Sequence, residues 1–216
     1  MKVNKFVLAL CCLSFLGNII LLFNLPQNIP IHWGFYNNVN GYGSRWYVLI
    51  GAFLPLIAYC LMILLFKFVA ATSKNSDSVN STAKIYELFT LIEVIFCIGF
   101  NWTLNAKYSG FNIDISSYAV GGSALLFILL GNYMGRIKPN SMFGIRTPWT
   151  LANGDVWRKT HRVGGRGLLI LGIIIFTIDV INSVAGLITM FTLLIVGTIL
   201  ITVYSYTQYK RFKIKI

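Results

Sequence analysis

The sequence predicts an all-α integral membrane protein, a bundle of six transmembrane helices with both termini in the cytoplasm. Of the 216 residues, 56% are hydrophobic and 11% are charged, whereas an ordinary soluble domain has about 25% charged residues. Residues 6–44, 46–66, 115–135 and 180–209 contain no Lys, Arg, Asp or Glu. An apolar run of about 18 residues is long enough to cross the hydrocarbon core of a bilayer. The composition therefore excludes a soluble enzyme.

The basic residues predict the orientation. The net charge is +12, which in a soluble protein would suggest nucleic-acid binding. However, 16 of the 18 Lys and Arg residues lie in alternate segments, namely the N-terminus, residues 67–84, 136–166 and 208–216. The positive-inside rule places these four segments in the cytoplasm. We expect them to meet anionic lipid headgroups, and we expect no direct nucleic-acid binding.

Six helices account for the apolar segments, and the last two of them need a separate argument. Between Gly167 and Thr207 the only charged residue is Asp179. A single helix over this stretch would be about 61 Å long, twice the thickness of the core. A turn is therefore expected among Asp179, Asn182, Ser183 and Gly186. The expected helices cover residues 5–24, 46–67, 84–105, 115–136, 166–181 and 184–207.

The helices are expected to form one membrane domain over residues 1–216. Within it, residues 1–67 form an N-terminal unit of two spans, and residues 115–216 form a C-terminal unit.

The extracellular connection between the first two helices is expected to be ordered. Pro26 and Pro30 each restrict their own backbone and that of the preceding residue, which favours an extended chain. The glycines of residues 40–44 favour a tight turn. Trp33 and Trp46 suit the headgroup region. We interpret this loop as a cap that lies close to the membrane.

The cytoplasmic connection from Arg136 to Arg166 is expected to contain a short amphipathic helix. Asn153 can cap this helix, and Asp155 is favourably placed in its first turn. Gly164 and Gly165 are expected to end it. Its apolar and basic faces fit a helix lying on an anionic leaflet. A solvated basic linker is the alternative.

Polar residues within the apolar segments are candidates for function or for packing. Glu93 lies nine residues after Lys84, about 13 Å into the bilayer, where an ionisable group is costly. Asn101 shares its helix face. The alternative to a functional Glu93 is a hydrogen-bonded carboxyl group that fixes helix packing.

Gly131 and Gly135 are four residues apart, so they share one helix face. Two glycines on one face let a neighbouring helix approach closely. A packing role is therefore the favoured interpretation of both. Asn132 could link helices through its amide.

Patterns that carry catalysis are mostly absent. The sequence has no HExxH, no P-loop lysine motif and no GxSxG. Its two histidines, His32 and His161, are expected on opposite sides of the membrane, and the four cysteines lie in apolar segments without CxxC spacing. We therefore expect no metal site, no cofactor and no catalytic residues.

Several segments resemble the SdpI family of bacterial membrane proteins. Ile29–Trp33 and Asn40–Arg45 resemble its N-terminal conserved domain. Four further segments resemble the family's C-terminal signature: Gly131–Gly135, Lys138–Asn140, Gly144–Leu151 and Val156–Arg162.

The resemblance implies a multi-pass protein of a bacterial plasma membrane that gives immunity to a secreted antimicrobial peptide toxin. It also implies a receptor role in which a transcriptional repressor is sequestered at the membrane. The binding candidates in the outer loop are His32, Trp33, Asn40 and Arg45. Those in the cytoplasmic loop are Asn140, Arg146, Pro148, Trp149, Trp157, Arg158 and His161. The alternative function is an intramembrane enzyme or a small-solute or proton-coupled transporter centred on Glu93.

Overall fold

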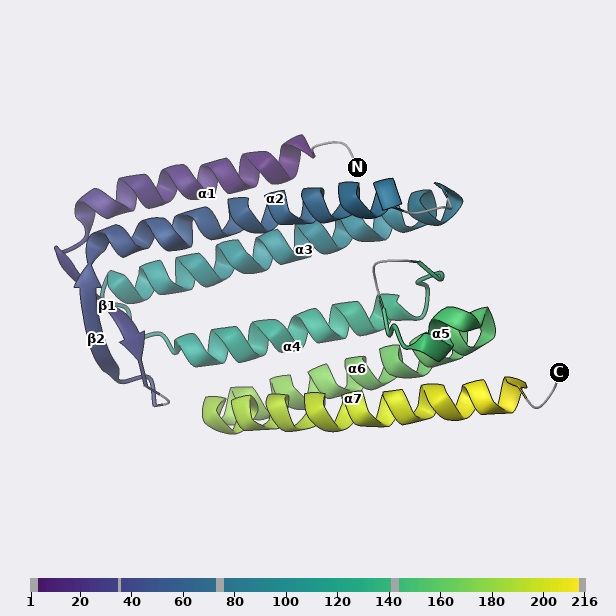
Figure 1. Cartoon of the computed structure of the whole chain (residues 1–216). Helices are drawn as coiled ribbons and strands as arrows, with labels where there is room; N and C mark the ends of the chain where they lie inside the picture. The colour runs from purple at the N-terminus through teal and green to yellow at the C-terminus, as the bar shows by residue number, and fades with distance from the viewer. Residues whose placement is uncertain (1–3, 35, 73–75, 141–143, 214–216) are drawn as a thin grey trace. The chain divides into compact units, whose positions relative to one another are not determined.

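The structure is a computed structural model that describes residues 4–34, 36–72, 76–140 and 144–213, and most of these residues are helical (Figure 1). A two-stranded hairpin of β1 (Asn28–Trp33) and β2 (Val39–Ser44) interrupts the helices and is followed by a short 3-10 helix, Arg45–Tyr47. The helices are α1 (Lys5–Asn24), α2 (Val48–Thr72), α3 (Ser76–Tyr108), α4 (Ile115–Met134), α5 (Pro148–Ala152), α6 (Gly154–Ile181) and α7 (Ser183–Lys213).

Five helical stretches in the described residues are long and apolar enough to cross a membrane: Lys5–Asn24, Arg45–Phe68, Ile115–Met134, Gly154–Ile181 and Ser183–Phe212. The chain is therefore an α-helical membrane protein, as its composition predicts. The helix α3, where the sequence places a sixth span, is not among these five. It carries Glu87 and Glu93 in its described part.

The chain divides into two compact units, and the first comprises Met1–Thr72 and Ala83–Ala119. Here α1, α2 and α3 lie side by side, with the hairpin at one end (Figure 1). Val7, Cys11, Tyr59 and Val94 form a buried cluster between the three helices. A second cluster, next to the hairpin, consists of Leu22, Leu25, Ile29 and Val48.

The hairpin corrects the turn expected at residues 40–44. These residues belong to β2, where Ser44 pairs with Asn28 and Gly43 with Ile29. The chain reverses earlier, where the N–H of Gly34 donates to the carbonyl of Asn38 at 2.9 Å. The glycines of β2 serve close packing instead, because a Cβ at Gly43 would lie 2.8 Å from the side chain of Ile31.

The second unit comprises Ser73–Thr82 and Val120–Ile216. In it, α6 and α7 are joined through Asn182, whose N–H donates to the carbonyl of Ile178 and whose side chain accepts from the N–H of Ala185. The turn predicted around Asn182 is therefore confirmed. Gly186 lets α7 approach α6, since a Cβ there would lie 2.8 Å from the Cα of Asp179.

Gly131 and Gly165 are the points where α4 and α6 approach each other. A Cβ on Gly131 would lie 2.6 Å from the carbonyl oxygen of Gly165, and one on Gly165 would lie 2.7 Å from that of Gly131. The predicted packing role of Gly131 is therefore confirmed. Gly135 lies next to the Cα of Arg162.

The separate amphipathic helix of the 136–166 connection was a wrong prediction. Asn153 does cap a helix, and Asp155 lies in its first turn, but α6 runs through Gly164 and Gly165 to Ile181 without a break. The two glycines are used for packing: Gly165 against α4, and Gly164 against the side chains of Ile145 and Ile201. A helix that is packed along both glycines does not end there, in spite of their low helix propensity.

Candidate functional site

Two sites collect most of the candidate residues, one in each unit. We call the first the signature site; it consists of Gly144–Leu151 and the Val156–Arg162 part of α6. The second is the hairpin site, which consists of β1, β2 and the residues that hold them. Each is built within its own unit.

His161 is the central residue of the signature site. It is fully buried. Its Nε2 accepts a hydrogen bond from the backbone N–H of Ile145 at 2.9 Å, and its Nδ1 lies 2.9 Å from the carbonyl oxygen of Trp157. Gly144 has φ +108°, and a Cβ there would collide with the imidazole ring. The ring therefore holds the Gly144–Ile145 backbone against α6.

Trp157 lies beneath His161 and is also fully buried. The two rings stack with centroids 4.0 Å apart. The indole Nε1 donates to the carbonyl of Ile137 at 2.9 Å, so Trp157 also ties the segment after α4 to α6. Since its ring is covered on all sides, Trp157 packs inside the unit and cannot act as an anchor at the membrane interface.

The short helix α5 brings Trp149 onto α7. Thr147 and Thr150 form a capping box at its start, with Pro148 at the first helical position, where proline is well tolerated. The Trp149 indole Nε1 donates to Ser205 Oγ. Its ring also packs against Tyr206, with centroids 5.3 Å apart.

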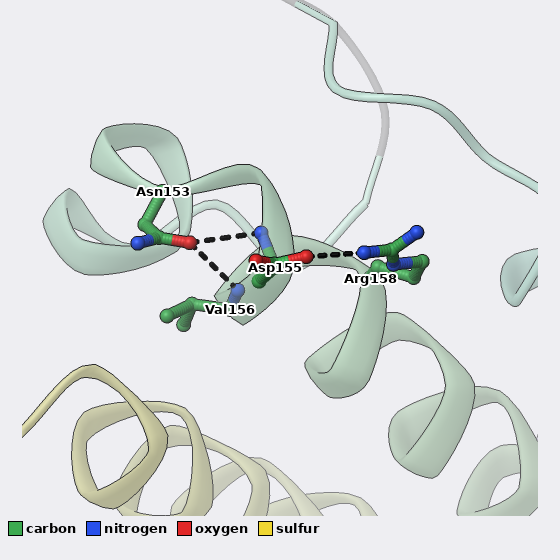
Figure 2. A network of polar contacts seen from close by, with 4 residues as sticks. All are labelled: Asn153, Asp155, Val156 and Arg158. Atoms are coloured by element: carbon green, nitrogen blue, oxygen red, sulfur yellow. Dashed lines mark hydrogen bonds and ion pairs between the residues drawn. The ribbon is translucent and has the colours of Figure 1, made fainter. Parts of the chain in front are cut away.

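The cations of the signature site point outward. Arg146 and Arg158 are both exposed. Arg158 forms an ion pair with Asp155, three residues earlier on α6, and Asn153 accepts from the N–H groups of Asp155 and Val156 (Figure 2). Lys159 lies over the ring of Phe212. The site thus has a buried aromatic interior and a basic exterior.

Asn140 lies at the margin of the signature site. Its side-chain amide donates to the carbonyl of Lys138 at 2.8 Å, which stabilises a local turn. This contact gives Asn140 a structural role in the segment that follows α4.

The hairpin site presents a polar pair on one face and an aromatic stack on the other. His32 Nδ1 and Asn40 Oδ1 are hydrogen-bonded across the two strands, on the exposed face. Trp33 stacks on Tyr108 at the end of α3, with ring centroids 6.1 Å apart. Ile29 is fully buried between the helices. The alternation of faces along β1 therefore separates the core from the exposed surface.

Two further contacts fix the hairpin to the helices. Arg45 donates through its guanidinium to the carbonyl of Leu25 at 3.3 Å, and its backbone N–H donates to the carbonyl of Gln27. Asn37, with φ 60°, donates from its side chain to the carbonyl of Ile113 at 3.1 Å. The hairpin is consequently tied both to the end of α1 and to the connection after α3.

Asn101 belongs to a buried chain of amides between α1 and α3. Asn18 Nδ2 donates to Asn101 Oδ1 at 2.9 Å, and Asn105 Nδ2 donates to Asn18 Oδ1 at 2.8 Å. A Cβ at Gly51 would collide with the amide of Asn101, so α2 closes the third side. These amides act as packing contacts between helices.

The other intramembrane candidates are less enclosed. Glu93 is half-buried on α3, while Tyr86 on the same helix is fully buried and donates to the carbonyl of Met62. Asn132 is exposed on α4. Its position gives no support to the link between helices that was considered for it.

Sequence reasoning missed Asn18, Asn105 and Ser205. Each is a polar residue inside an apolar segment, and this was the available signal, because such a residue needs a hydrogen-bond partner in lipid. Asp179 was assigned to a turn; it is buried on α6, against Gly121 and Gly186. Within the described part of the chain, His, Cys, Asp and Glu form no group of three that could hold a metal ion.

Comparison with known proteins extends over nearly the whole chain. The SdpI/YfhL protein family matches residues 136–205, and a domain of unknown function, DUF1648, matches residues 9–58. The "Immunity protein SdpI" of Bacillus subtilis (strain 168) is 27% identical over 213 residues, which are 98% of this chain and 98% of that protein. No solved structure matches the chain.

Proposed function

We propose that the chain is a member of the SdpI/YfhL protein family, and that it is an immunity protein of a bacterial plasma membrane that protects its own cell from a secreted antimicrobial peptide toxin. The similarity to the Bacillus subtilis immunity protein over 98% of both chains carries this proposal. It includes the residues that build the signature site and the hairpin site. Similarity over the full length of both chains supports a shared class of function, and this class does not specify which toxin is recognised.

The proposal includes six spans, with α3 as the sixth. Within the first unit, Tyr86, ten residues after the start of α3, bonds to the carbonyl of Met62 on α2, and Tyr108 at the end of α3 stacks on Trp33. The two residues are about 33 Å apart along the helix, which matches the hydrocarbon core. A helix that runs alongside α1 and α2 for this length crosses the membrane with them. Both termini are then on the same side, which the basic residues place in the cytoplasm.

In this orientation the hairpin site faces outward and is where the toxin is met. Its exposed face offers the His32–Asn40 pair, while Trp33 and Arg45 hold the hairpin on the helices. We assign recognition to the exposed pair and positioning to the two partly buried contacts, those of Trp33 and Arg45.

The signature site then faces the cytoplasm, where a receptor role would need it. Its exposed Arg146 and Arg158 suit carboxylates or phosphates, so an acidic surface of a repressor protein, or anionic lipid, is the proposed partner here. His161 and Trp157 support this surface from below.

A survival assay tests the immunity function. Deletion of the gene in its host should sensitise cells to a peptide of a bacteriocin panel, and re-expression should restore survival. A His32→Ala, Asn40→Ala double variant should fail to restore it while reaching the membrane at wild-type level. A Tyr36→Ala variant, also exposed near the hairpin, serves as the matched control. If deletion changes survival against no peptide of the panel, the proposal is wrong.

The enzyme or transporter centred on Glu93 is the weaker candidate. Such an activity would need a second polar group near Glu93, and Asn101, which shares its helix face, is already bonded to Asn18. Glu93→Gln discriminates the two functions, because an amide keeps a packing hydrogen bond but cannot exchange a proton. Full protection by Glu93→Gln would exclude proton-coupled activity at this residue.

A further inference from the structure

A cleft of about 720 Å³ lies at the start of α6, within the second unit. One wall is the segment that follows α4, with Arg136 and Lys138. The other wall is the first turn of α6, with Asn153, Asp155 and Arg158. Figure 2 shows this second wall, where Asp155 and Arg158 face each other and Asn153 closes the helix end. The volume is that of a small-ligand site.

The cleft has an excess of positive charge. Three cations and one carboxylate line it, which leaves a formal charge of +2. Arg136 lies over the face of the Tyr133 ring, with its guanidinium carbon 5.3 Å from the ring centroid. Lys159 and Lys210 lie over Phe212 and Tyr206 instead, and neither lines the cleft. The cleft thus gathers Arg136, Lys138 and Arg158 from two segments of the unit.

The walls of the cleft are held together before any ligand arrives. Trp157 donates to the carbonyl of Ile137 at 2.9 Å, and both residues are buried. Asn153 accepts from the N–H groups of Asp155 at 2.8 Å and Val156 at 3.2 Å. Since those amide groups are already paired, an anion in the cleft would be held by the cationic side chains. A preformed site of this kind loses little entropy on binding.

We propose that this cleft, lined by Arg136, Lys138 and Arg158, is a binding site for a phosphate group. Guanidinium groups match the geometry of phosphate oxygens through paired hydrogen bonds, and the lysine adds a mobile point charge. The excess of two positive charges is opposite in sign to both forms of phosphate, the singly charged phosphodiester of a lipid headgroup and the free ion. The same group is offered by the headgroup of an anionic phospholipid and by free phosphate. The cleft shares Arg158 with the cytoplasmic surface proposed above, but its phosphate binding can be measured whether or not the chain confers immunity.

Two probes separate the two sources on the full-length protein. Native mass spectrometry measures retention of phosphatidylglycerol by protein released from vesicles of phosphatidylcholine with phosphatidylglycerol as the minority lipid. Calorimetric titration with sodium phosphate, against sodium chloride of equal ionic strength, measures free phosphate. The variants are Arg136→Gln, Lys138→Gln and Arg158→Gln. Lys159→Gln is the matched control, because it removes the same charge from the neighbouring residue outside the cleft.

Each cleft variant should weaken binding of at least one probe about ten-fold, the effect of one charge-assisted hydrogen bond, while Lys159→Gln keeps wild-type binding. Gly154→Glu gives a second measurement: a Cβ there meets nothing within 4 Å, so the carboxylate adds repulsion without removing a contact, and it should also weaken binding. Gly154→Ala is its control. Retention of phosphatidylglycerol alone identifies the headgroup as the source, and binding of sodium phosphate identifies the free anion. Binding of neither probe, or an equal loss in Lys159→Gln, would overturn the proposal.

Discussion

His161 and Ile145, sixteen positions apart, are joined by a hydrogen bond from the Ile145 backbone N–H to the His161 Nε2 atom at 2.9 Å. An N–H group can only donate, and the Trp157 carbonyl beside Nδ1 can only accept. The imidazole is therefore neutral and carries its proton on Nδ1. This tautomer is what connects the Gly144–Leu151 segment to α6 in the signature site.

Removing the acceptor from this contact should destabilise the second unit. His161→Phe keeps an aromatic ring on Trp157 but leaves the Ile145 N–H without a partner. We expect a loss of about 1–3 kcal/mol in the free energy of unfolding, measured by denaturant titration in detergent micelles. His32→Phe is the control, since His32 is exposed. Equal stability of the two variants would show that the Ile145 contact contributes nothing.

The amide chain between α1 and α3 should show energetic coupling. In a double-mutant cycle, Asn18→Ala and Asn105→Ala should couple by about 0.6–1.7 kcal/mol, which lies between the average and the largest coupling of hydrogen bonds between membrane helices. Asn18→Ala with Asn24→Ala is the control cycle, because Asn24 is exposed and its side-chain amide donates within α1, to the carbonyl of Ile20. Additive effects in the first cycle would show that the hydrogen bond between Asn18 and Asn105 does not stabilise the packing of α1 against α3.

Two glycines of α6 should respond differently to a methyl group. Gly165→Ala places a Cβ against the backbone of α4, 2.7 Å from the Gly131 oxygen, and should destabilise the protein by about 1–3 kcal/mol. Gly167→Ala meets nothing within 4 Å and should be neutral or stabilising, since alanine is the better helix former. Thermal unfolding of both variants measures the difference. If Gly165→Ala is as stable as Gly167→Ala, the close approach of α4 and α6 is wrong.

Arg146→Lys should impair protection or signalling while membrane insertion stays normal. The helix α5 is held by its own capping box and by Trp149, so the exposed Arg146 is left to meet a partner. A paired contact with a carboxylate or phosphate should weaken by about 1–3 kcal/mol with lysine. Survival is compared with that of Arg162→Lys, another exposed cation. Normal function of Arg146→Lys would reduce this residue to a topology signal.

Cysteine labelling measures the orientation of the protein in the membrane. The variants are made in a protein from which the four native cysteines have been removed. Single cysteines at Asn38 and Ser183 should react from outside the cell. Those at Ser76, Asn153 and Lys213 should react only after the membrane is permeabilised. Labelling of a cysteine at position 153 from outside the cell would show that the orientation is the opposite one. The signature site would then face outward and the hairpin site the cytoplasm.

Much of the helical plan was predictable because it depends on properties that are local along the chain. Charge-free segments indicated where α1, α2, α4 and α7 lie, and the excess length after Gly167 required the turn that occurs at Asn182. The N-cap at Asn153 was readable in the same way, since a cap concerns only the next two or three residues. The family was recognisable from short runs, including the one around His161.

The tertiary structure decided how the glycines and polar residues are used. Gly164 and Gly165 look like a helix end in sequence, yet α6 continues through them because α4 and Ile145 pack on the space they leave. Tryptophan is a residue type that often lies at the membrane interface. The indole of Trp157 is nevertheless buried, because it donates a hydrogen bond to the carbonyl of Ile137. Asn18 finds Asn105 from 87 positions away. A polar group in lipid must find a partner, but which one it finds depends on helices that are distant in sequence.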